Sequence, residues 1–247
     1  MLITSFSRKG WQSYGRRFLA SYQDTKQTLP LWIYHEFNQP EMPVVPGVTW
    51  LPLEDTPSFR PVEERMAANP EMCGIVKDPQ GVESYNYRFD AHKFFRKVFA
   101  INHAYQNAPK GETSMVWVDA DVEFIRPVPQ SLQRILFPRG ETVCHLDRIN
   151  MYSECGFVGV NLQNEQSARR FMMTYWGLYS TGAFSHLREW HDCMVLDHAR
   201  IVSAVHSYSL SGDRCTDLYP WDLSILSDWM VHHKGPERKD KAYKEAA

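Results

Sequence analysis

Two aspartates stand one residue apart at the end of a short apolar run, in the segment Asp119-Ala120-Asp121. Residues 115–118 are Met, Val, Trp and Val, a pattern typical of a strand that is buried on both faces. Burying an unpaired carboxylate costs several kcal/mol, so we expect both side chains at the carboxyl edge of an open sheet, where α/β proteins bind ligands. There the pair can share a divalent cation that keeps positions open for phosphate oxygens. A turn, or a cap of the next helix, would explain the same tripeptide.

A second group of candidate ligands lies near the end of the sequence, where His232 and His233 are followed by Arg238 and Lys239. An imidazole nitrogen is a ligand that Mn²⁺ accepts alongside carboxylates. The two basic residues are suited to neutralising a diphosphate. A cation held between carboxylates and a diphosphate stabilises the negative charge that grows on a nucleoside-diphosphate leaving group.

With these two segments the sequence resembles the metal-dependent nucleotide-sugar glycosyltransferases of the GT-A fold, and most closely the glycogenin and lipopolysaccharide galactosyltransferase type. Those enzymes carry an Asp-x-Asp (DXD) motif at the end of a central strand and, far downstream, a His-x-x-Gly-Pro-x-Lys segment. The counterparts here are Asp119-Ala120-Asp121 and His232-His233-Lys234-Gly235-Pro236-Glu237-Arg238. The resemblance implies that Asp119, Asp121 and His232 are metal ligands and that His233 faces elsewhere. Arg238 stands where the family has Lys, which keeps the charge but changes the hydrogen-bonding geometry.

Two looser matches suggest residues on the sugar side of such a site. Residues 154–161 resemble the family's Asn-x-Gly-Val segment, and Asp192-Cys193-Met194-Val195-Leu196 resembles its Asp-Gln-x-x-Leu helix start, whose acid contacts the donor sugar. By this resemblance Asp192 is the first catalytic candidate and Glu154 is the second. Cys193 replaces a Gln that lies beside the reacting carbon in the family. A first-turn aspartate also stabilises a helix dipole, so a capping role is the alternative for Asp192.

The resemblance also implies how the donor binds: segment 5–14 would hold the nucleoside, and Lys97 or Arg96 would assist at the base or phosphate. The expected donor-binding residues are Ser5, Phe6, Tyr14, Lys97, Asp119, Gly235 and Arg238. The implied activity is that of a hexosyltransferase, which moves a hexose from a nucleoside-diphosphate sugar, expected to be a UDP-sugar, to an acceptor hydroxyl with help from Mn²⁺ or Mg²⁺. The acceptor stays open, because a glycan, a lipid core, a protein or a modified nucleic-acid base would each suit such an enzyme.

The elements that must position these residues alternate between strands and helices. Residues 2–6, 31–34 and 48–51 are expected strands, with a turn at Lys9-Gly10 and a helix over residues 11–22. This βαβ rhythm predicts an α/β fold with a mostly parallel sheet. The resemblance adds that the fold is GT-A-like, with a single Rossmann-type sheet flanked by helices.

The rest of the sequence continues the pattern with less regular stretches. Residues 54–88 contain four prolines and are expected to form an irregular connection with one short helix near residues 62–68. Expected helices lie at 90–105, 130–136, 165–179 and from 190 onward, and expected strands at 142–146 and 157–160. Gly156 and Gly159 suggest close approach of a ligand to the backbone, or a bulge.

Length and composition limit the alternatives. A chain of 247 residues suits one domain, here residues 1–239, followed by a charged tail at 240–247. The five cysteines are odd in number and include no CxxC pair, which argues against a disulfide framework and against a structural zinc site. The net charge of −2 supplies no basic field for non-specific nucleic-acid binding. With no long apolar N-terminal segment and no run near the roughly 20 apolar residues of a membrane span, a cytoplasmic location is expected.

Other function classes stay open beside the transferase. A nucleotidyltransferase or nucleotide-sugar pyrophosphorylase shares the sheet and the paired acids, but it usually carries a Gly-rich activation loop near the N-terminus, where this chain has only Lys9-Gly10 and Gly15-Arg16-Arg17. A two-metal phosphatase or nuclease needs more Asp and His residues around a second ion. A non-catalytic nucleotide-sugar-binding protein with a transferase shell is the remaining alternative.

Overall fold

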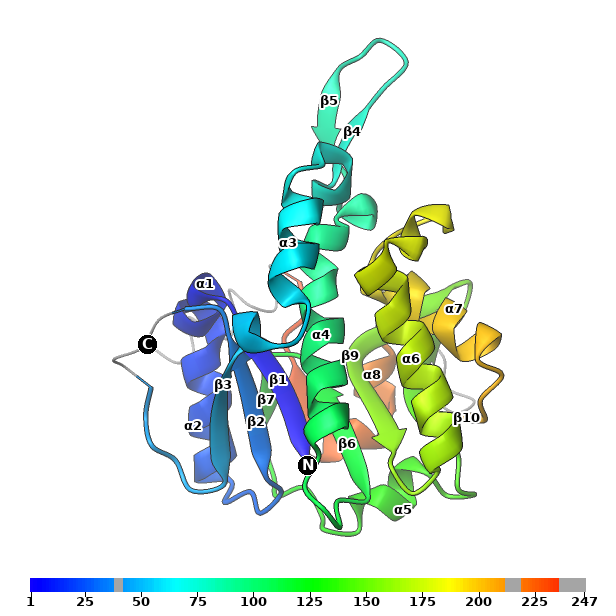
Figure 1. Cartoon of the computed structure of the whole chain (residues 1–247). Helices are drawn as coiled ribbons and strands as arrows, with labels where there is room; N and C mark the ends of the chain where they lie inside the picture. The colour runs from blue at the N-terminus through cyan, green and yellow to red at the C-terminus, as the bar shows by residue number, and fades with distance from the viewer. Residues whose placement is uncertain (38–41, 212–218, 236–247) are drawn as a thin grey trace.

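The computed structural model describes residues 1–37, 42–211 and 219–235 as a layered α/β structure (Figure 1). Over these residues, a seven-stranded sheet runs in the order β10-β8-β9-β6-β1-β2-β3. Its strands are β1 (Leu2–Phe6), β2 (Leu31–His35), β3 (Val48–Pro52), β6 (Ser114–Val118), β8 (Val143–Arg148), β9 (Met151–Asn161) and β10 (Ser207–Ser209). The pairings are parallel except for those of β9, which lies antiparallel to both β6 and β8. The predicted mostly parallel sheet is confirmed.

Strand β6 is buried along its whole length because helices cover both faces of the sheet. Its side chains alternate between two hydrophobic cores, as the pleat of a strand requires. Met115 and Trp117 belong to one core, and Val116 and Val118 belong to the other. The expectation of two-sided burial is therefore confirmed, and the carboxyl end of β6 is held firmly in the middle of the molecule.

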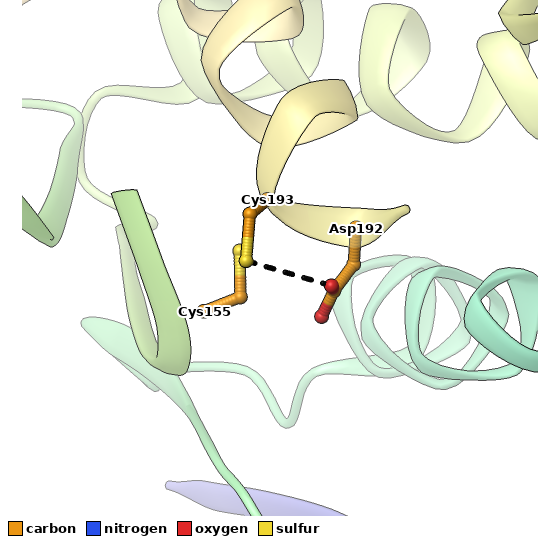
Figure 2. A group of neighbouring side chains, drawn as sticks. All are labelled: Cys155, Asp192 and Cys193. Carbon is orange, nitrogen blue, oxygen red and sulfur yellow. Dashed lines mark hydrogen bonds between the residues drawn. The ribbon is translucent and has the colours of Figure 1, made fainter. Parts of the chain in front are cut away.

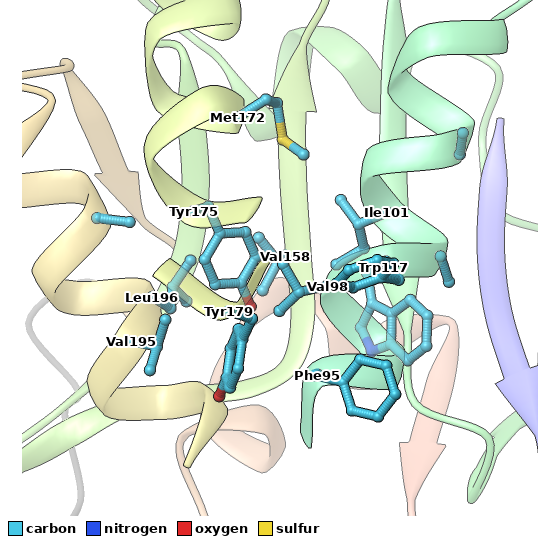
Figure 3. Close-up of a cluster of buried hydrophobic side chains, with 14 of the residues drawn as sticks. Phe95, Val98, Ile101, Trp117, Val158, Met172, Tyr175, Tyr179, Val195 and Leu196 are labelled. Carbon is cyan, nitrogen blue, oxygen red and sulfur yellow. The ribbon is translucent and has the colours of Figure 1, made fainter. Parts of the chain in front are cut away.

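Helices on the two faces of the sheet complete the two cores. The Trp117 core is covered by α3 (Phe59–Ala67), α4 (Ala91–Asn107), α6 (Glu165–Thr181) and α7 (Asp192–Val202), and Figure 3 shows Phe95, Tyr175 and Leu196 from three of these helices around Val158 of β9. The other core is covered by α2 (Arg16–Asp24), α5 (Leu132–Leu136) and α8 (Pro220–Leu223). The long helix predicted at 90–105 is confirmed, and it begins where the Asp90 side chain accepts a hydrogen bond from the Lys93 amide.

The connection after β1 differs from the prediction. A turn was expected at Lys9-Gly10, whereas Arg8–Gly10 forms α1, which passes through a wide helical turn at Trp11–Gly15 into α2. The Ser7 side chain caps this helix by accepting a hydrogen bond from the Gly10 amide at 3.0 Å. Gly10 itself has helical dihedral angles, so this glycine does not break the helix.

Two small sheets were not predicted. Strands β4 (Ile75–Lys77) and β5 (Glu83–Tyr85) form an antiparallel hairpin that projects beyond α3 (Figure 1), inside the stretch expected to be irregular. Strands β7 (Val122–Phe124) and β11 (Met230–His232) also pair antiparallel, with His232 opposite Val122. Short 3-10 helices occupy Leu53–Asp55, Pro70–Cys73, Tyr87–Phe89, Ala183–His186 and Ile225–Asp228.

In the described part of the chain, no helix combines the length and apolar character that a membrane span requires. The single domain at residues 1–239 and the cytoplasmic location remain predictions. The expected tail at 240–247 lies outside the described residues.

A stability prediction follows from the close packing of β8 against β9. A methyl group added at Gly159 would collide with Sγ of Cys144 and lie 3.2 Å from Phe137 Cζ, in a core that has no room to yield. We expect Gly159→Ala to lower the free energy of unfolding by about 1–3 kcal/mol, measured from urea midpoints at constant m-value. Cys144→Ala should recover part of this loss in the double variant. Strictly additive effects of the two substitutions would contradict the proposed collision.

Candidate functional site

The Asp119-Ala120-Asp121 segment forms the turn between β6 and β7. The Asp119 amide donates to the carbonyl of Gly156 at 2.8 Å, and its own carbonyl accepts from the Val122 amide at 3.1 Å. The structure therefore contains the turn that the sequence offered as an alternative. It also places both aspartates at the carboxyl end of a buried strand, as expected. The turn orients the two carboxylates, and the Asp121 carbonyl accepts a further hydrogen bond from the His233 amide at 3.0 Å.

Strand β11 brings the downstream histidines to this turn. His232 Nε2 lies 3.2 Å from Oδ1 of Asp121, whereas His233 Nε2 lies 2.9 Å from Oε2 of Glu123. Consecutive side chains of a strand point to opposite faces, so only one of the two histidines can face the aspartates. His232 is that residue, and it is almost fully buried.

The residues expected to hold a metal have converged. One ligand atom each from Asp119, Asp121 and His232 lies within 4.8 Å of the other two. The Trp221 ring packs against His232, with 4.9 Å between the ring centroids. Gly156 makes room for the imidazole, because a methyl group at this position would lie 2.7 Å from His232 Cε1. Two carboxylates and an imidazole suit Mn²⁺ or Mg²⁺, with positions left for other oxygen ligands. The sequence associated Gly156 with a ligand or a bulge, whereas in the structure this glycine makes room for the His232 side chain.

Lys97 of α4 connects the metal-binding turn to α7. Its Nζ donates to Asp192 Oδ2 at 2.8 Å and to the Cys155 carbonyl at 2.6 Å, and lies 3.0 Å from Asp119 Oδ1. Burial alone would lower the pKa of Lys97, but attraction by Asp119 and Asp192 raises this pKa well above its ordinary value. The ammonium group thus donates two hydrogen bonds within the protein and forms an ion pair with Asp119 as well. This favours a positioning role for Lys97 over the expected contact with a base or phosphate.

The two catalytic candidates, Asp192 and Glu154, are both buried and both paired. Burial opposes ionisation of Asp192, yet Lys97 holds the pKa of this carboxyl below its ordinary value. Glu154 accepts from the Gly156 amide at 3.0 Å and forms an ion pair with Lys234. Burial would raise the pKa of Glu154 as well, but the charges of Lys234 and His232 lower it. Both carboxylates are therefore ionised and fixed in position at neutral pH.

The three candidate metal ligands and the two catalytic candidates line one cavity of about 990 Å³. Of the predicted site residues, the lining includes Asp119, Asp121, Glu154, Asp192, His232 and Gly235. Ser5, Phe6 and Tyr14 do not line it, and the Phe6 side chain is packed in the core against Trp11 and Phe18. Arg96 instead forms ion pairs with Glu36 and Glu63, and Arg238 lies outside the described residues.

Sequence reasoning missed the cationic residues of the cavity lining, among them Lys234 and Arg148, which contact Glu154. Lys234 pairs with Glu154, and Arg148 lies 3.5 Å from the same carboxylate. Lys234 lies two positions after His232 in the histidine segment, so the sequence could have indicated that it belongs to the same site. Arg148 had no such signal, because the turn between β8 and β9 that brings it to Glu154 does not follow from the local pattern.

Two solved structures are similar to this chain over nearly its whole length. A glycosyltransferase involved in the glycosylation of the major capsid of PBCV-1 is 10% identical, with a TM-score of 0.51, over 97% of this chain and 98% of that one. The apo form of mouse xyloside xylosyltransferase 1 is 11% identical, with a TM-score of 0.48, over 92% and 90%. Comparison of the sequence with family models and with curated proteins gives no match. The chain has the mixed α/β fold of GT-A glycosyltransferases, as predicted.

The Lys97 cluster predicts a pH-dependent loss of stability. Lys97→Met leaves the Asp192 carboxylate buried without its counter-charge, which we expect to cost about 3–5 kcal/mol of unfolding free energy at neutral pH. In the wild type the lowered pKa of Asp192 contributes stability above its ordinary value of 3.8, and this contribution is lost only as the pH falls through the folded-state pKa. In the variant, the unpaired carboxyl takes up a proton more readily, so the difference between the two proteins should shrink at about pH 4.5.

Urea denaturation at the two pH values measures this difference. Lys93→Met is the matched control on the same helix, because the Lys93 side chain is exposed, and it should change stability by less than about 0.5 kcal/mol. An equal loss for Lys97→Met at both pH values would contradict the assignment.

Proposed function

We propose that this protein is a divalent-metal-dependent glycosyltransferase that moves a hexose from a nucleoside-diphosphate sugar, a UDP-sugar in our assignment, to an acceptor hydroxyl. The observation that carries the proposal is the meeting of Asp119, Asp121 and His232 within 4.8 Å at the carboxyl end of the central strand. The GT-A fold supports it, because this fold places its ligands at that edge of the sheet. The glycogenin and lipopolysaccharide galactosyltransferase type remains our proposed subtype.

The metal-binding residues in this proposal are Asp119, Asp121 and His232. A bound Mn²⁺ or Mg²⁺ supplies a Lewis acid that neutralises charge on a diphosphate leaving group. An ion pair with Lys97 and a hydrogen bond from the Trp117 indole at 2.6 Å hold Oδ1 of Asp119. His232 is oriented by its tilted ring contact with Trp221. Asp119 and His232 are thus held by neighbouring side chains before a metal ion binds, which reduces the cost of ordering them.

Lys234 and Gly235 are our candidates for the diphosphate. The Lys234 ammonium is partly exposed at the cavity wall and close to His232, so a phosphate beside the metal ligands would lie within its electrostatic reach. Gly235 has a φ of +87°, a conformation that a side chain disfavours, and its backbone can approach a ligand closely. Arg238 stays in the proposal as a further cation from the segment beyond the described residues.

Asp192 and Glu154 are the candidates for the sugar side. Asp192 keeps one carboxylate oxygen on Lys97, so its other oxygen is the one that can accept from a sugar or acceptor hydroxyl. Glu154, which pairs with Lys234, would hold that cation beside the leaving group. For the nucleoside we retain Ser5 and Phe6, the last two residues of β1 at the same edge of the sheet, and Tyr14 from the helical turn that follows. Of these, Ser5 and Tyr14 have partly exposed side chains.

Aromatic side chains in the cavity favour a glycan among the possible acceptors. The rings of Tyr152 and Tyr87 lie 5.2 and 6.1 Å from the His191 ring, and Arg188 is exposed on the same lining. Rings with an apolar face and a polar tip suit a ligand that has both apolar and hydroxyl surfaces, as sugars do.

Substitution of the metal ligands tests the proposed function. With Mn²⁺ and a panel of nucleotide sugars, release of UDP or GDP should fall at least about 100-fold in Asp121→Asn and in His232→Asn, equivalent to about 2.7 kcal/mol. His233→Asn is the matched control, because this side chain faces Glu123, and it should retain wild-type turnover. Full activity of Asp121→Asn would refute the assignment. Metal-dependent UDP binding without turnover in the wild type would favour the non-catalytic shell, and mass spectrometry of products from candidate acceptors would separate transfer from pyrophosphorylase chemistry.

A second prediction concerns the space that Gly156 leaves for His232. Gly156→Ala places a methyl group 2.7 Å from His232 Cε1, so the imidazole must shift away from the aspartates. We expect Mn²⁺ affinity, measured by electron paramagnetic resonance titration, to fall at least about 10-fold. Gly177→Ala in α6 is the control, because nothing lies within 4 Å of an added methyl group there. An unchanged Mn²⁺ affinity in Gly156→Ala would exclude His232 as a ligand.

A further inference from the structure

Two thiols and a carboxylate meet on the wall of the cavity, apart from the Asp119 cluster. Cys155 comes from β9, and Asp192 and Cys193 are the first two residues of α7. One ligand atom from each lies within 4.8 Å of the other two (Figure 2). All three residues line the cavity, so the group is in contact with the space that a ligand would enter.

The distance from the Cys193 sulfur to the Asp192 carboxylate matches a tetrahedral metal site, and the Cys155 sulfur lies within 4.8 Å of both atoms. A zinc ion with Zn–S of about 2.3 Å and Zn–O of about 2.1 Å separates a sulfur from an oxygen ligand by about 3.6 Å, and two sulfurs by about 3.8 Å. Cys193 Sγ lies 3.6 Å from Oδ1 of Asp192. This oxygen is the one that Lys97 does not use, since Lys97 binds Oδ2. An ion can therefore bind here without breaking the Lys97 contact.

The charges around the group also suit a divalent ion. Metal-bound cysteines are thiolates, and two thiolates with the Asp192 carboxylate carry three negative charges, of which Lys97 balances one and a divalent ion the rest. The hydrogen bond with Cys155 lowers the pKa of the Cys193 thiol against the effect of burial, whereas burial raises the pKa of Cys155. Glu154 adds negative charge nearby, and His191 contacts the Cys193 thiol. Ion binding is then expected to release thiol protons.

We propose that Cys155, Asp192 and Cys193 form a second metal site that takes one thiophilic divalent cation of the Zn²⁺ type, with a fourth coordination position open to the cavity. Soft sulfur ligands favour Zn²⁺ or Cd²⁺, whereas the oxygen-rich Asp119 cluster suits Mn²⁺ or Mg²⁺, so the two sites select different ions. Occupancy of the second site also obstructs Asp192. Only this inhibitory consequence rests on the proposed transferase function.

Cadmium titration of the reduced full-length chain tests the site without any activity assay. We expect a thiolate-to-cadmium charge-transfer absorption in the near ultraviolet that saturates at one ion per chain. The band should be lost in Cys193→Ser and in Cys155→Ser. It should persist in the variant Cys73→Ser/Cys144→Ala/Cys215→Ser, which retains only the two proposed cysteine ligands, and in Asp121→Asn, which changes only the other site.

A second measurement keeps the test decisive if a buried-cysteine variant fails to fold. In the wild type, Zn²⁺ should slow alkylation of Cys193 at least about 10-fold while leaving the rate at Cys73 unchanged, as mapped by peptide mass spectrometry. A cadmium band that survives in folded Cys193→Ser, or alkylation of Cys193 that Zn²⁺ does not slow, would overturn the proposal. If the chain transfers sugar, Zn²⁺ inhibition should weaken at least about 10-fold in Cys193→Ser, and equal inhibition of both proteins would remove the inhibitory role but not the site.

Discussion

The candidate site depends on one buried ammonium group. Lys97 stands between Asp119, which follows β6, and Asp192, which begins α7, and it also donates to the backbone of β9. A buried charge of either sign would be costly alone, but here the ammonium group donates two hydrogen bonds and two carboxylates share its positive charge. The same ion pairs join three elements that have no covalent connection near the cavity. The position of each acid is therefore set by the cation between them.

In each of the two acids, one carboxylate oxygen contacts Lys97 and the other is available to contact a ligand. Asp119 uses Oδ1 for Lys97 and for the Trp117 indole, and Asp192 uses Oδ2 for Lys97. The remaining oxygen of each carboxylate is oriented as a result. Such pre-orientation is what a site needs if it stabilises charge without reorganising during a reaction.

Much of the fold follows from local patterns, whereas only part of the site does. Buried strands such as residues 114–118 and long helices such as 91–107 have strong periodicity, and their types were predicted correctly. The β4–β5 hairpin was missed because its side chains are exposed or only partly buried and show no apolar pattern. The acids and the histidine were found through their residue types and through the family resemblance, but the Lys97 contacts and the meeting of Cys155 with Cys193 arise from packing between distant segments. No CxxC spacing marks that thiol pair, since its members come from a strand and a helix.

The pairing of β7 with β11 has a consequence for how the protein matures. His232 is 111 positions beyond Asp121, so during translation the acidic turn leaves the ribosome long before the imidazole that faces it. Until the ribosome has released β11, a nascent chain carries the two carboxylates without the strand that closes over them. Formation of this three-residue strand must therefore wait until the 111 positions after Asp121 have been synthesised, and the cluster of Asp119, Asp121 and His232 can assemble only then.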